Sequence, residues 1–294
     1  MIDLERYLES KTDAVNRALM LSMPTGGPAL ITAAMRYSIE CGGKRLRPVL
    51  TLATAEALGA DDSAVMDVAC SVELVHTYSL IHDDLPAMDN SDLRRGAPTC
   101  HKVYGDAIAV LTGDALLTLA FEKIARFGSR DGNAEKAIKI VTLLAEAAGA
   151  KGMIGGQTLD LLAEGKDLLL EEVKKIAALK TGALLRAAVV SGAIAAGASE
   201  NQQELLRRYA LAIGTAFQIV DDLLDYESTT EELGKPAGAD QAREKATYPA
   251  ILGPLEARRQ AEAFHSEAIA ALNEVDCPTE LLAALAGKLV YRKK

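Results

Sequence analysis

The sequence predicts an all-α protein built as a helical bundle. Apolar residues recur at intervals of three and four positions over long segments such as 65–75 and 205–224, which is the pattern of amphipathic helices. Alternating apolar and polar residues, the pattern of a half-buried strand, are essentially absent. The chain has no Trp and only four Phe, so Ala and Leu must supply most of the core. We expect roughly ten or more helices joined by short turns.

The predicted helices are separated by glycine and proline rather than by long linkers. In chain order, the expected breaks are at 24–28, 42–43, 129–133, 155–156 and 234–238, since these residues disfavour helix. The longest weakly polar stretch, 187–198, is too short to span a bilayer and is predicted to be a buried helix. No segment divides the chain by composition, so residues 1–294 are predicted to form a single domain.

Charge and cysteine content narrow the class of protein. The net charge is −9, from 41 acidic and 32 basic residues, and an acidic chain without a long basic run is a poor binder of nucleic acid. The four cysteines show no CxxC pairing, which suits a reducing compartment. The N-terminal 15 residues carry no signal-peptide core. We therefore expect a cytoplasmic protein with no nucleic-acid partner and no integral membrane segment.

Two aspartate pairs each follow an apolar helical segment. Residues 79–89 read SLIHDDLPAMD and residues 217–225 read FQIVDDLLD. In the second, Asp221 and Asp225 are four positions apart and share a helix face, with Asp222 at its edge. Such close carboxylates repel one another unless a cation lies between them.

The first pair needs a turn to gather its carboxylates. Asp83 and Asp84 are followed by Asp89, which cannot continue the same helical face. Pro86 disfavours helix at the residue before it, so Asp89 is predicted to fold back towards Asp83.

All-oxygen clusters of this kind favour a hard divalent ion, and Mg²⁺ typically takes one or two carboxylates, waters and phosphate oxygens. Zinc would need more nitrogen or sulfur ligands than His82 provides. A di-iron site would need a second Glu-x-x-His pair beside Glu73 and His76, and the chain has none.

Basic residues surround both clusters in the sequence. They fit a polyanion that is bound partly through metal and partly through direct contact. Neither a GxxxxGK[ST] loop nor a GxGxxG motif after a strand is present, so side chains and metal must hold the phosphates. With the hydroxyl of Thr181 beside Lys180, the candidate residues are Lys44, Arg45, Arg47, Arg94, Arg95, Lys180, Lys235 and Lys245.

Six blocks of this chain occur in the order found in trans-isoprenyl diphosphate synthases. They are GGKRLRP, HTYSLIHDDLPAMDNSDLRRG, GGQTLDL, LKTG, FQIVDDLLD and GKPAGADQAREKATYP, running from about Gly42 to Pro249. The chain most resembles the bacterial farnesyl diphosphate synthases. The resemblance implies an all-α bundle around a central cavity, Mg²⁺ as cofactor with three ions per site, isoprenyl diphosphates as substrates and a homodimer.

The resemblance also implies roles for individual residues. Asp83, Asp89 and Asp221 would coordinate the metal ions, while Asp84, Asp222 and Asp225 would hold metal-bound waters or orient the ligands. Thr181 and Gln218 would lie beside the breaking bond. The allylic diphosphate would contact Arg94, Lys180, Lys235 and Lys245. Isopentenyl diphosphate would contact Lys44, Arg47, His76 and Arg95.

Product length is expected to be set beneath the first motif. Tyr78 lies five residues before Asp83, and its ring would form a floor in the apolar tunnel, with Ser79 beside it. With the family context this predicts a C15 product. Two departures from the family pattern, Ser91 before Asp92 and Ala239 in place of a frequent Lys, leave the other predicted bases intact.

Other functions remain open on the sequence. A geranylgeranyl diphosphate synthase has the same chemistry and a deeper tunnel. A terpene cyclase shares aspartate-bound magnesium but has no need of GGKRLRP. A non-catalytic helical partner subunit has no need of intact aspartates in both motifs. The basic tail, residues 291–294, is predicted to close over the isopentenyl site.

Overall fold

The computed structural model describes residues 3–166, 168–227 and 247–292. Most of these residues are helical, as predicted. The elements are α1 (Leu4–Leu21), α2 (Ala29–Glu40), α3 (Leu46–Ala57), α4 (Asp62–Asp83), β1 (Leu93–Arg94), β2 (Ala97–Pro98), α5 (Cys100–Tyr104), α6 (Asp106–Gly128), α7 (Ala134–Ala148), α8 (Met153–Ala163), α9 (Leu170–Ala177), the π-helix η1 (Ala178–Gly182), α10 (Ala183–Ala196), α11 (Glu200–Glu227), α14 (Tyr248–Leu252), α15 (Pro254–Asn273) and α16 (Glu280–Val290).

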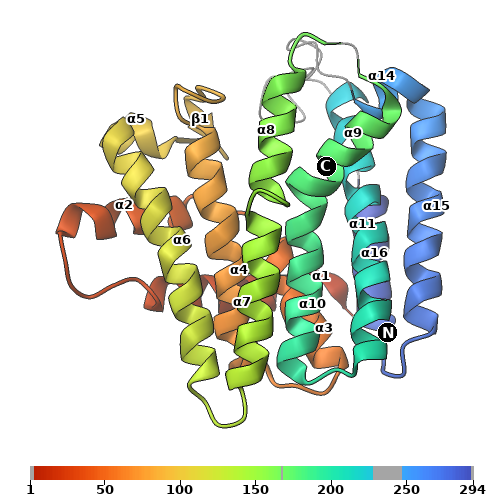
Figure 1. Ribbon diagram of the computed structural model, residues 1–294, viewed down its shortest axis with the longest axis horizontal. Coiled ribbons are helices and arrows are strands. Elements are labelled where there is room, and N and C mark those ends of the chain that lie inside the picture. Colours follow the sequence, from red (N-terminus) through yellow and green to blue (C-terminus); the bar gives the residue numbers. More distant parts are fainter. Residues whose placement is uncertain (1–2, 167, 228–246, 293–294) are drawn as a thin grey trace.

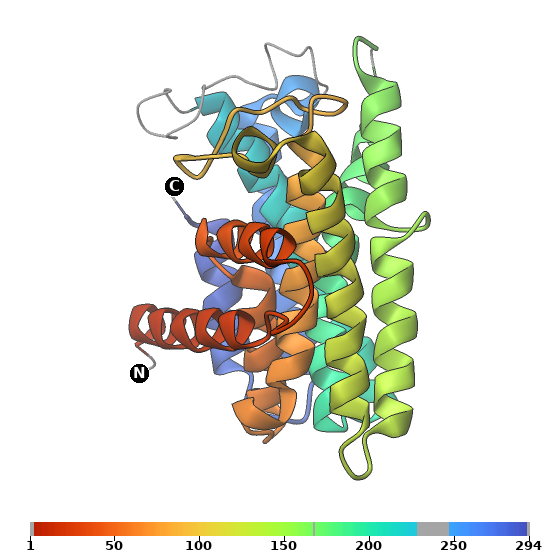
Figure 2. The same ribbon diagram turned by 90° about the vertical axis from the view of Figure 1, so that its left-hand side faces the viewer.

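The long helices run side by side along the upright axis of Figure 1. Helices α4, α6, α7, α10, α11 and α15 form this array, and α1 and α2 cross it on one side, as Figure 2 shows. The two ends of the chain lie on that same side. Helices α4 and α11, which carry the two aspartate motifs, both end at the upper end of the array in Figure 1. The fold therefore brings together motifs that are more than 100 residues apart in the sequence.

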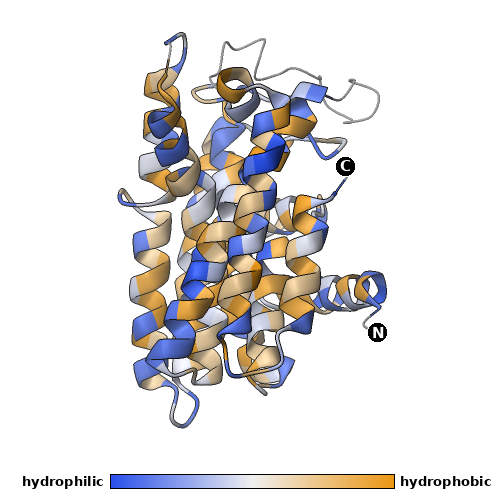
Figure 3. Cartoon of the chain, turned by 90° about the vertical axis from the view of Figure 1, so that its right-hand side faces the viewer, coloured by the Kyte–Doolittle hydropathy of each residue, from blue (hydrophilic) through white to orange (hydrophobic). Residues whose placement is uncertain are grey.

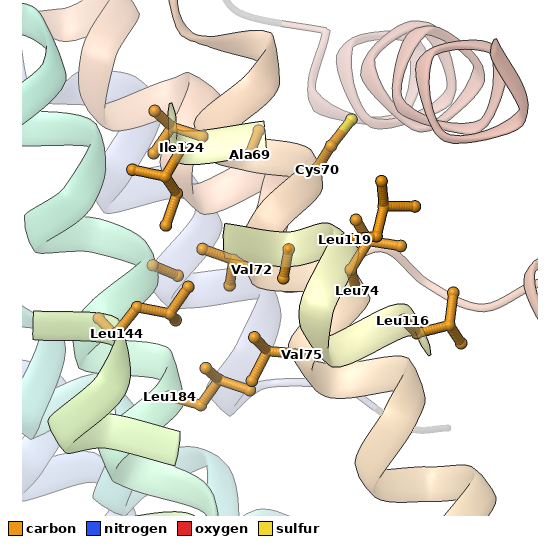
Figure 4. Packing of buried hydrophobic residues seen from close by; sticks show 14 of the residues in the cluster. Ala69, Cys70, Val72, Leu74, Val75, Leu116, Leu119, Ile124, Leu144 and Leu184 are labelled. Carbon is orange, nitrogen blue, oxygen red and sulfur yellow. The ribbon is translucent and has the colours of Figure 1, made fainter. Parts of the chain in front are cut away.

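Helix α4 lies at the centre of the larger hydrophobic core. Its residues Val72, Leu74 and Val75 pack against side chains of α6, α7 and α10, among them Leu116 and Leu184 (Figure 4). All of these are fully buried. Burial of one such side chain stabilises the fold by about 1.5–3 kcal/mol. Since every residue from Val68 to Val75 is buried, α4 is covered on all sides, which accounts for its central place in the bundle.

Helix α10 is buried on almost all sides, which confirms the prediction of a buried helix near 187–198. It approaches α3 closely because Gly192 has no side chain. A Cβ at Gly192 would overlap the backbone oxygen of Thr51. The hydroxyl of Thr51 also donates to the carbonyl of Ala188, at 2.9 Å. Close backbone contact and a buried hydrogen bond together fix α10 against α3.

One predicted helix break is wrong. Gly155 and Gly156 lie inside α8, and the chain turns earlier, between Gly149 and Gly152. Gly156 is needed for close packing rather than for a turn, since a Cβ there would overlap the backbone of Lys180.

The other predicted breaks have different outcomes. Those at 24–28, 42–43 and 129–133 are confirmed. The break at 234–238 lies outside the described residues. The sequence also gave no signal for the two-residue hairpin of β1 and β2.

Two helical segments are long and apolar enough to cross a membrane by length and composition alone. They are Asp62–Asp83 and Leu170–Ala196, and most residues in their apolar windows are buried by other helices. Buried core helices meet the same criterion, so these segments are weak evidence for a membrane span. Figure 3 shows hydrophilic residues interspersed along the helices on the α15 side of the molecule.

Candidate active site

A cavity of about 1240 Å³ opens among α1, α3, α4, the hairpin, η1, α11 and α16. Its wall includes side chains from both halves of the chain, because α4 and α11 both border it. Nine of the residues predicted from the sequence line it: Lys44, Arg45, Arg47, His76, Arg94, Arg95, Thr181, Gln218 and Asp221. The sequence therefore identified most of the charged wall of one shared cavity.

The first aspartate motif folds back on itself as predicted. Helix α4 ends at Asp83, and the backbone N–H of Asp89 donates to the carbonyl of Asp83 at 2.8 Å. Pro86 stands in the intervening turn. The side chain of Asp84 is buried, and the guanidinium of Arg94 donates to both its oxygens at 2.7 Å. Asp84 thus holds Arg94 at the cavity wall in this structure.

Asp83 lies where a carboxylate is poorly stabilised. Burial, together with the negative charge of Asp89, raises the pKa of Asp83 to about 6, although Lys180 and Arg94 oppose the shift. A cation near this carboxylate would relieve both effects. The environment of Asp83 therefore fits a metal ligand.

The three aspartates of the second motif lie in different environments. Helix α11 runs unbroken through the motif, so the predicted spacing holds. The side chain of Asp221 is 53% exposed and lines the cavity. Asp222 is buried, accepting from Gln218 Nε2 at 2.7 Å and from the backbone N–H of Tyr248 at 3.2 Å. Asp225 is buried as well. Asp222 thus orients Gln218, and Asp221 alone of the three reaches the cavity wall.

The donor set fits a hard divalent cation. Within the described residues, no three His, Cys, Asp or Glu side chains converge on one point. Mg²⁺ does not need such a cage, because it usually takes one or two carboxylates and completes its shell with water and phosphate oxygens. Asp83, Asp89 and Asp221 offer ligands of that kind. A phosphate-bearing ligand would supply the remaining oxygens.

The π-helix η1 places Lys180 and Thr181 at the site. Such single-turn π segments often occur at functional positions. Helix α8 packs directly against this turn through Gly156, and Nζ of Lys180 donates to Oδ2 of Asp160 at 2.7 Å. The sequence did not identify Asp160 as a site residue, although it belongs to the GGQTLDL block. Its spacing from Lys180 along the chain gives no sign of this contact.

Replacing Asp160 by Asn should lower kcat by about tenfold, by analogy with outer-shell residues that orient a ligand-binding group. The amide keeps the size of the side chain but removes the charge that positions Lys180. Steady-state kinetics would measure the effect, and thermal unfolding would check that the fold is intact. Asp160→Glu should retain more activity than Asp160→Asn. Equal activity of the parent and Asp160→Asn would contradict this role.

Several cations crowd the part of the cavity near α3. Burial, and then the charge of Arg47, lowers the pKa of His76 well below its usual value. Burial also lowers the pKa values of Lys44 and Arg47. Nε of Arg47 is buried without a hydrogen-bond acceptor. Several cationic side chains around one cavity, with a buried donor of Arg47 that lacks an acceptor, form a site suited to an anion.

Arg95 closes one side of this region. Its guanidinium donates to the carbonyl of Gly42 and lies so close to Gly43 that a Cβ there would overlap it. Gly43 has a φ of 140°, which other residues rarely adopt. The glycine pair therefore ends α2 and also makes room for Arg95.

Arg45, a candidate anion-binding residue in the sequence, instead has a structural role, because its guanidinium is paired inside the protein. Its Nη1 donates to Glu73 Oε1 at 2.7 Å, and its Nε donates to Asn16 at 2.8 Å. The Arg45 and Glu73 side chains are 1% and 2% exposed. Since Glu73 is paired with Arg45, the structure gives no support to a metal role for the Glu73–His76 pair.

Tyr78 lies on α4 one and a half turns before Asp83, where the core meets the site. Its ring is buried and packs edge-on against His82, with centroids 5.7 Å apart. Burial, together with Asp83, raises its pKa to about 12, and its hydroxyl is buried without a hydrogen-bond partner. The neighbouring Ser79 hydroxyl donates to the carbonyl of His76 at 2.9 Å. The position of Tyr78 is compatible with a steric floor beneath the first motif.

Some predicted residues cannot be placed. Lys235, Lys245 and Ala239 lie outside the described residues. The proposed contacts of the two lysines with the allylic diphosphate stay predictions.

Comparison with known proteins identifies the family of the chain. A family model described as polyprenyl synthetase matches residues 28–285. A farnesyl diphosphate synthase from Geobacillus stearothermophilus is 47% identical over 268 residues, covering 91% of this chain and 90% of that protein. The heterodimeric geranylgeranyl pyrophosphate synthase large subunit 1 of Arabidopsis thaliana chloroplasts is 46% identical over 296 residues, covering 99% and 80%.

A solved structure gives the same result. An FPP/GFPP synthase from Zymomonas mobilis superposes with a TM-score of 0.87 at 37% identity, covering 98% of this chain and 99% of that one. The resemblance predicted from the sequence blocks, and the all-α isoprenoid synthase fold that it implied, are both confirmed. The chain therefore belongs to the polyprenyl synthetase family.

Proposed function

We propose that this prenyltransferase condenses isopentenyl diphosphate with dimethylallyl or geranyl diphosphate, using Mg²⁺, to give C15 farnesyl diphosphate and pyrophosphate. One observation carries the proposal. Two aspartate motifs from distant parts of the chain end at the same end of the bundle, beside one cavity lined with cationic side chains. Such a site suits two diphosphates, one bound through metal and one bound by bases alone.

In this proposal Asp83, Asp89 and Asp221 hold Mg²⁺, with three ions per site, and Lys180 contacts the allylic diphosphate directly. When bound, Mg²⁺ supplies positive charge to the diphosphate as the allylic C–O bond breaks. Asp84 and Asp222 act indirectly. Asp84 holds Arg94 in position and Asp222 holds Gln218, each by a hydrogen bond. Asp225, buried on the same helix, is proposed to orient the other ligands.

The second substrate is proposed to occupy the crowded cationic region. Lys44, Arg47, His76 and Arg95 line it and would bind the diphosphate of isopentenyl diphosphate without metal. The low pKa of His76 keeps its imidazole neutral at pH 7, so it contributes a hydrogen bond and the bases contribute charge.

The reaction follows from binding the two substrates in different parts of the cavity. The allylic C–O bond breaks, and its electron pair leaves with the diphosphate oxygen. Thr181 and Gln218 line the cavity where the allylic cation would form, and their oxygen dipoles can steady it. The isopentenyl double bond then forms the new C–C bond, and loss of a proton to the released pyrophosphate restores a double bond. Correct positioning of the two substrates replaces covalent catalysis.

A direct assay tests the reaction and the product. Purified protein is incubated with Mg²⁺, isopentenyl diphosphate and dimethylallyl diphosphate, and the product is dephosphorylated and sized. A C15 alcohol is expected. A C20 product would instead support a geranylgeranyl diphosphate synthase, which the similarity to the Arabidopsis protein also favours. No condensation would remove the proposal and favour a terpene cyclase or a non-catalytic subunit.

Replacing Tyr78 by Ala should lengthen the main product beyond C15. Tyr78 is buried close to the first motif, and removing its ring would open space for a longer tail. Chromatography of the dephosphorylated products would measure the change. Tyr78→Phe is the matched control, since it keeps the ring and removes a hydroxyl that has no partner; its product should stay C15. An unchanged product in Tyr78→Ala would contradict the floor.

We further propose a cytoplasmic homodimer with residues 1–294 as one catalytic domain. All four cysteines are free thiols, which suits a reducing compartment. Exposed apolar side chains on the outer faces of α6 and α7, including Leu111 and Ile138, offer a surface for a second copy. Light scattering should give a mass of twice 31.1 kDa. A monomeric mass at micromolar concentration would contradict the dimer.

A further inference from the structure

The segment that follows α16 reaches back into the cavity through Tyr291 and Arg292. Helix α16 ends at Val290, and two residues later the Arg292 side chain lines the cavity wall and is only 12% exposed. Its Nη2 donates to Oδ1 of Asp221 at 2.9 Å. Its Cζ lies 4.4 Å from the ring centroid of Phe217, one helical turn before Asp221. The stacking and the ion pair hold one guanidinium in a defined position.

The guanidinium of Arg292 lies in a part of the cavity that already holds other cationic side chains. Burial, and then the charge of Arg292, lowers the pKa of Lys44 in the same cavity. Nε of Arg292 is buried and has no acceptor. Asp221 is the one acidic side chain paired with Arg292 among the ion pairs of the described residues. Arg292 therefore depends on Asp221 for its stabilisation by charge.

Arg292 and a metal ion would compete for the same carboxylate. We propose that Arg292 occupies Asp221 in the metal-free protein and is displaced when Mg²⁺ binds, so that the position of the C-terminal segment depends on metal binding. The inference rests on the proposed role of Asp221 as a metal ligand. Once displaced, the guanidinium and its unpaired Nε remain beside the cavity, available to an oxyanion.

Displacement of Arg292 by Mg²⁺ predicts the direction in which Mg²⁺ affinity changes when the Arg292 contact is removed. Any contact that must break before a ligand binds lowers the apparent affinity for that ligand. Removing the Arg292 contact should therefore tighten Mg²⁺ binding. Because Asp221 is half exposed, the contact is weak and the effect on Mg²⁺ affinity is modest, about two- to fivefold. The charge lost from Arg292 also favours a cation, so a control must remove an equal charge nearby without freeing Asp221.

Lys288 provides that control. It lines the same cavity from the last turn of α16, four residues before Arg292, and pairs with Glu5 rather than with Asp221. The experiment titrates Mg²⁺ into full-length protein with inorganic pyrophosphate present and measures binding by calorimetry. The variants are the parent, Arg292→Gln, Arg292→Lys, Lys288→Gln and Asp221→Ala.

Arg292→Gln should bind Mg²⁺ about two- to fivefold more tightly than the parent. Lys288→Gln should change affinity less, and Arg292→Lys should lie between the parent and Arg292→Gln. Equal affinities in Arg292→Gln and Lys288→Gln would overturn the exchange while leaving the metal site standing. Failure of the parent to bind Mg²⁺, or unaltered binding in Asp221→Ala, would overturn the proposed metal site and the exchange with it.

Hydrogen exchange gives a second readout that does not depend on catalysis. Mg²⁺ with pyrophosphate should change amide exchange in residues 287–292 of the parent, since Arg292 loses its anchor. In Arg292→Gln the same segment should exchange faster without metal and respond less when metal is added. If the amide hydrogen exchange of residues 287–292 in the parent is the same with and without Mg²⁺, the proposed displacement of Arg292 by metal is overturned.

Discussion

Alanine in place of Asp83 or Asp221 is expected to lower kcat by about a thousandfold, the size of effect seen when one preorganised charge-stabilising group is removed. Each variant removes a carboxylate that we propose holds Mg²⁺ beside the allylic diphosphate. For Asp83 the environment is consistent with this role, since burial and the charge of Asp89 raise its pKa and a nearby cation would oppose that shift. Steady-state turnover over a range of Mg²⁺ concentrations would measure the loss.

Asp92→Ala is the matched control. Asp92 also follows the first motif, but its side chain is 73% exposed and pairs with Lys102 away from the cavity. Its turnover should equal that of the parent. A chelator should abolish parent activity, and added Mg²⁺ should restore it. If Asp83→Ala and Asp221→Ala turn over substrate as fast as the parent, or if turnover continues in the presence of a chelator, the proposed metal-assisted mechanism is contradicted.

Glu73→Ala is expected to lower the free energy of unfolding by about 3–5 kcal/mol, because removing one partner of a buried ion pair leaves an uncompensated charge. Arg45 would remain buried with only Asn16 and a backbone carbonyl as acceptors. Arg45 also has a φ of 45°, in the left-handed region, so its position depends on these contacts. Denaturant unfolding would measure the change.

The double variant Arg45→Met with Glu73→Met separates charge from packing. Replacing both partners by apolar side chains removes the stranded charge, so the double variant should be more stable than Glu73→Ala. Glu73→Gln, which keeps an acceptor, should lose less stability than Glu73→Ala. Parental stability in Glu73→Ala would show that the pair does not hold α3 against α4.

The helical architecture was predictable because apolar periodicity is a local signal. The same local view misread Gly156, since a glycine pair in a sequence resembles a turn. Its true role depends on the backbone of Lys180, which is 24 residues away and brought close only by the fold. The hairpin of β1 and β2 is also too short to show an alternating pattern.

In the candidate site too, local geometry was predictable from the sequence and contacts between distant elements were not. The return of Asp89 to Asp83 was predictable because proline restricts the intervening turn. The partners of the charged groups were not, because Asp84 with Arg94, Asp160 with Lys180 and Arg292 with Asp221 pair across elements. Sequence spacing gives the faces of one helix, but it does not give the neighbour that each face meets.

The placement of the chain ends affects how the protein can be handled in the laboratory. Both termini lie on one side of the molecule (Figure 2). Helices α1 and α16 both line the cavity. An affinity tag on either end would therefore sit close to the site where substrates enter and bind. The exposed turn between α6 and α7, which includes Asp131 and Gly132, lies at the lower end of the bundle in Figure 1, away from the end where α4 and α11 finish. A label or immobilisation handle inserted there should leave the cavity free, since exposed loop tips tolerate insertions.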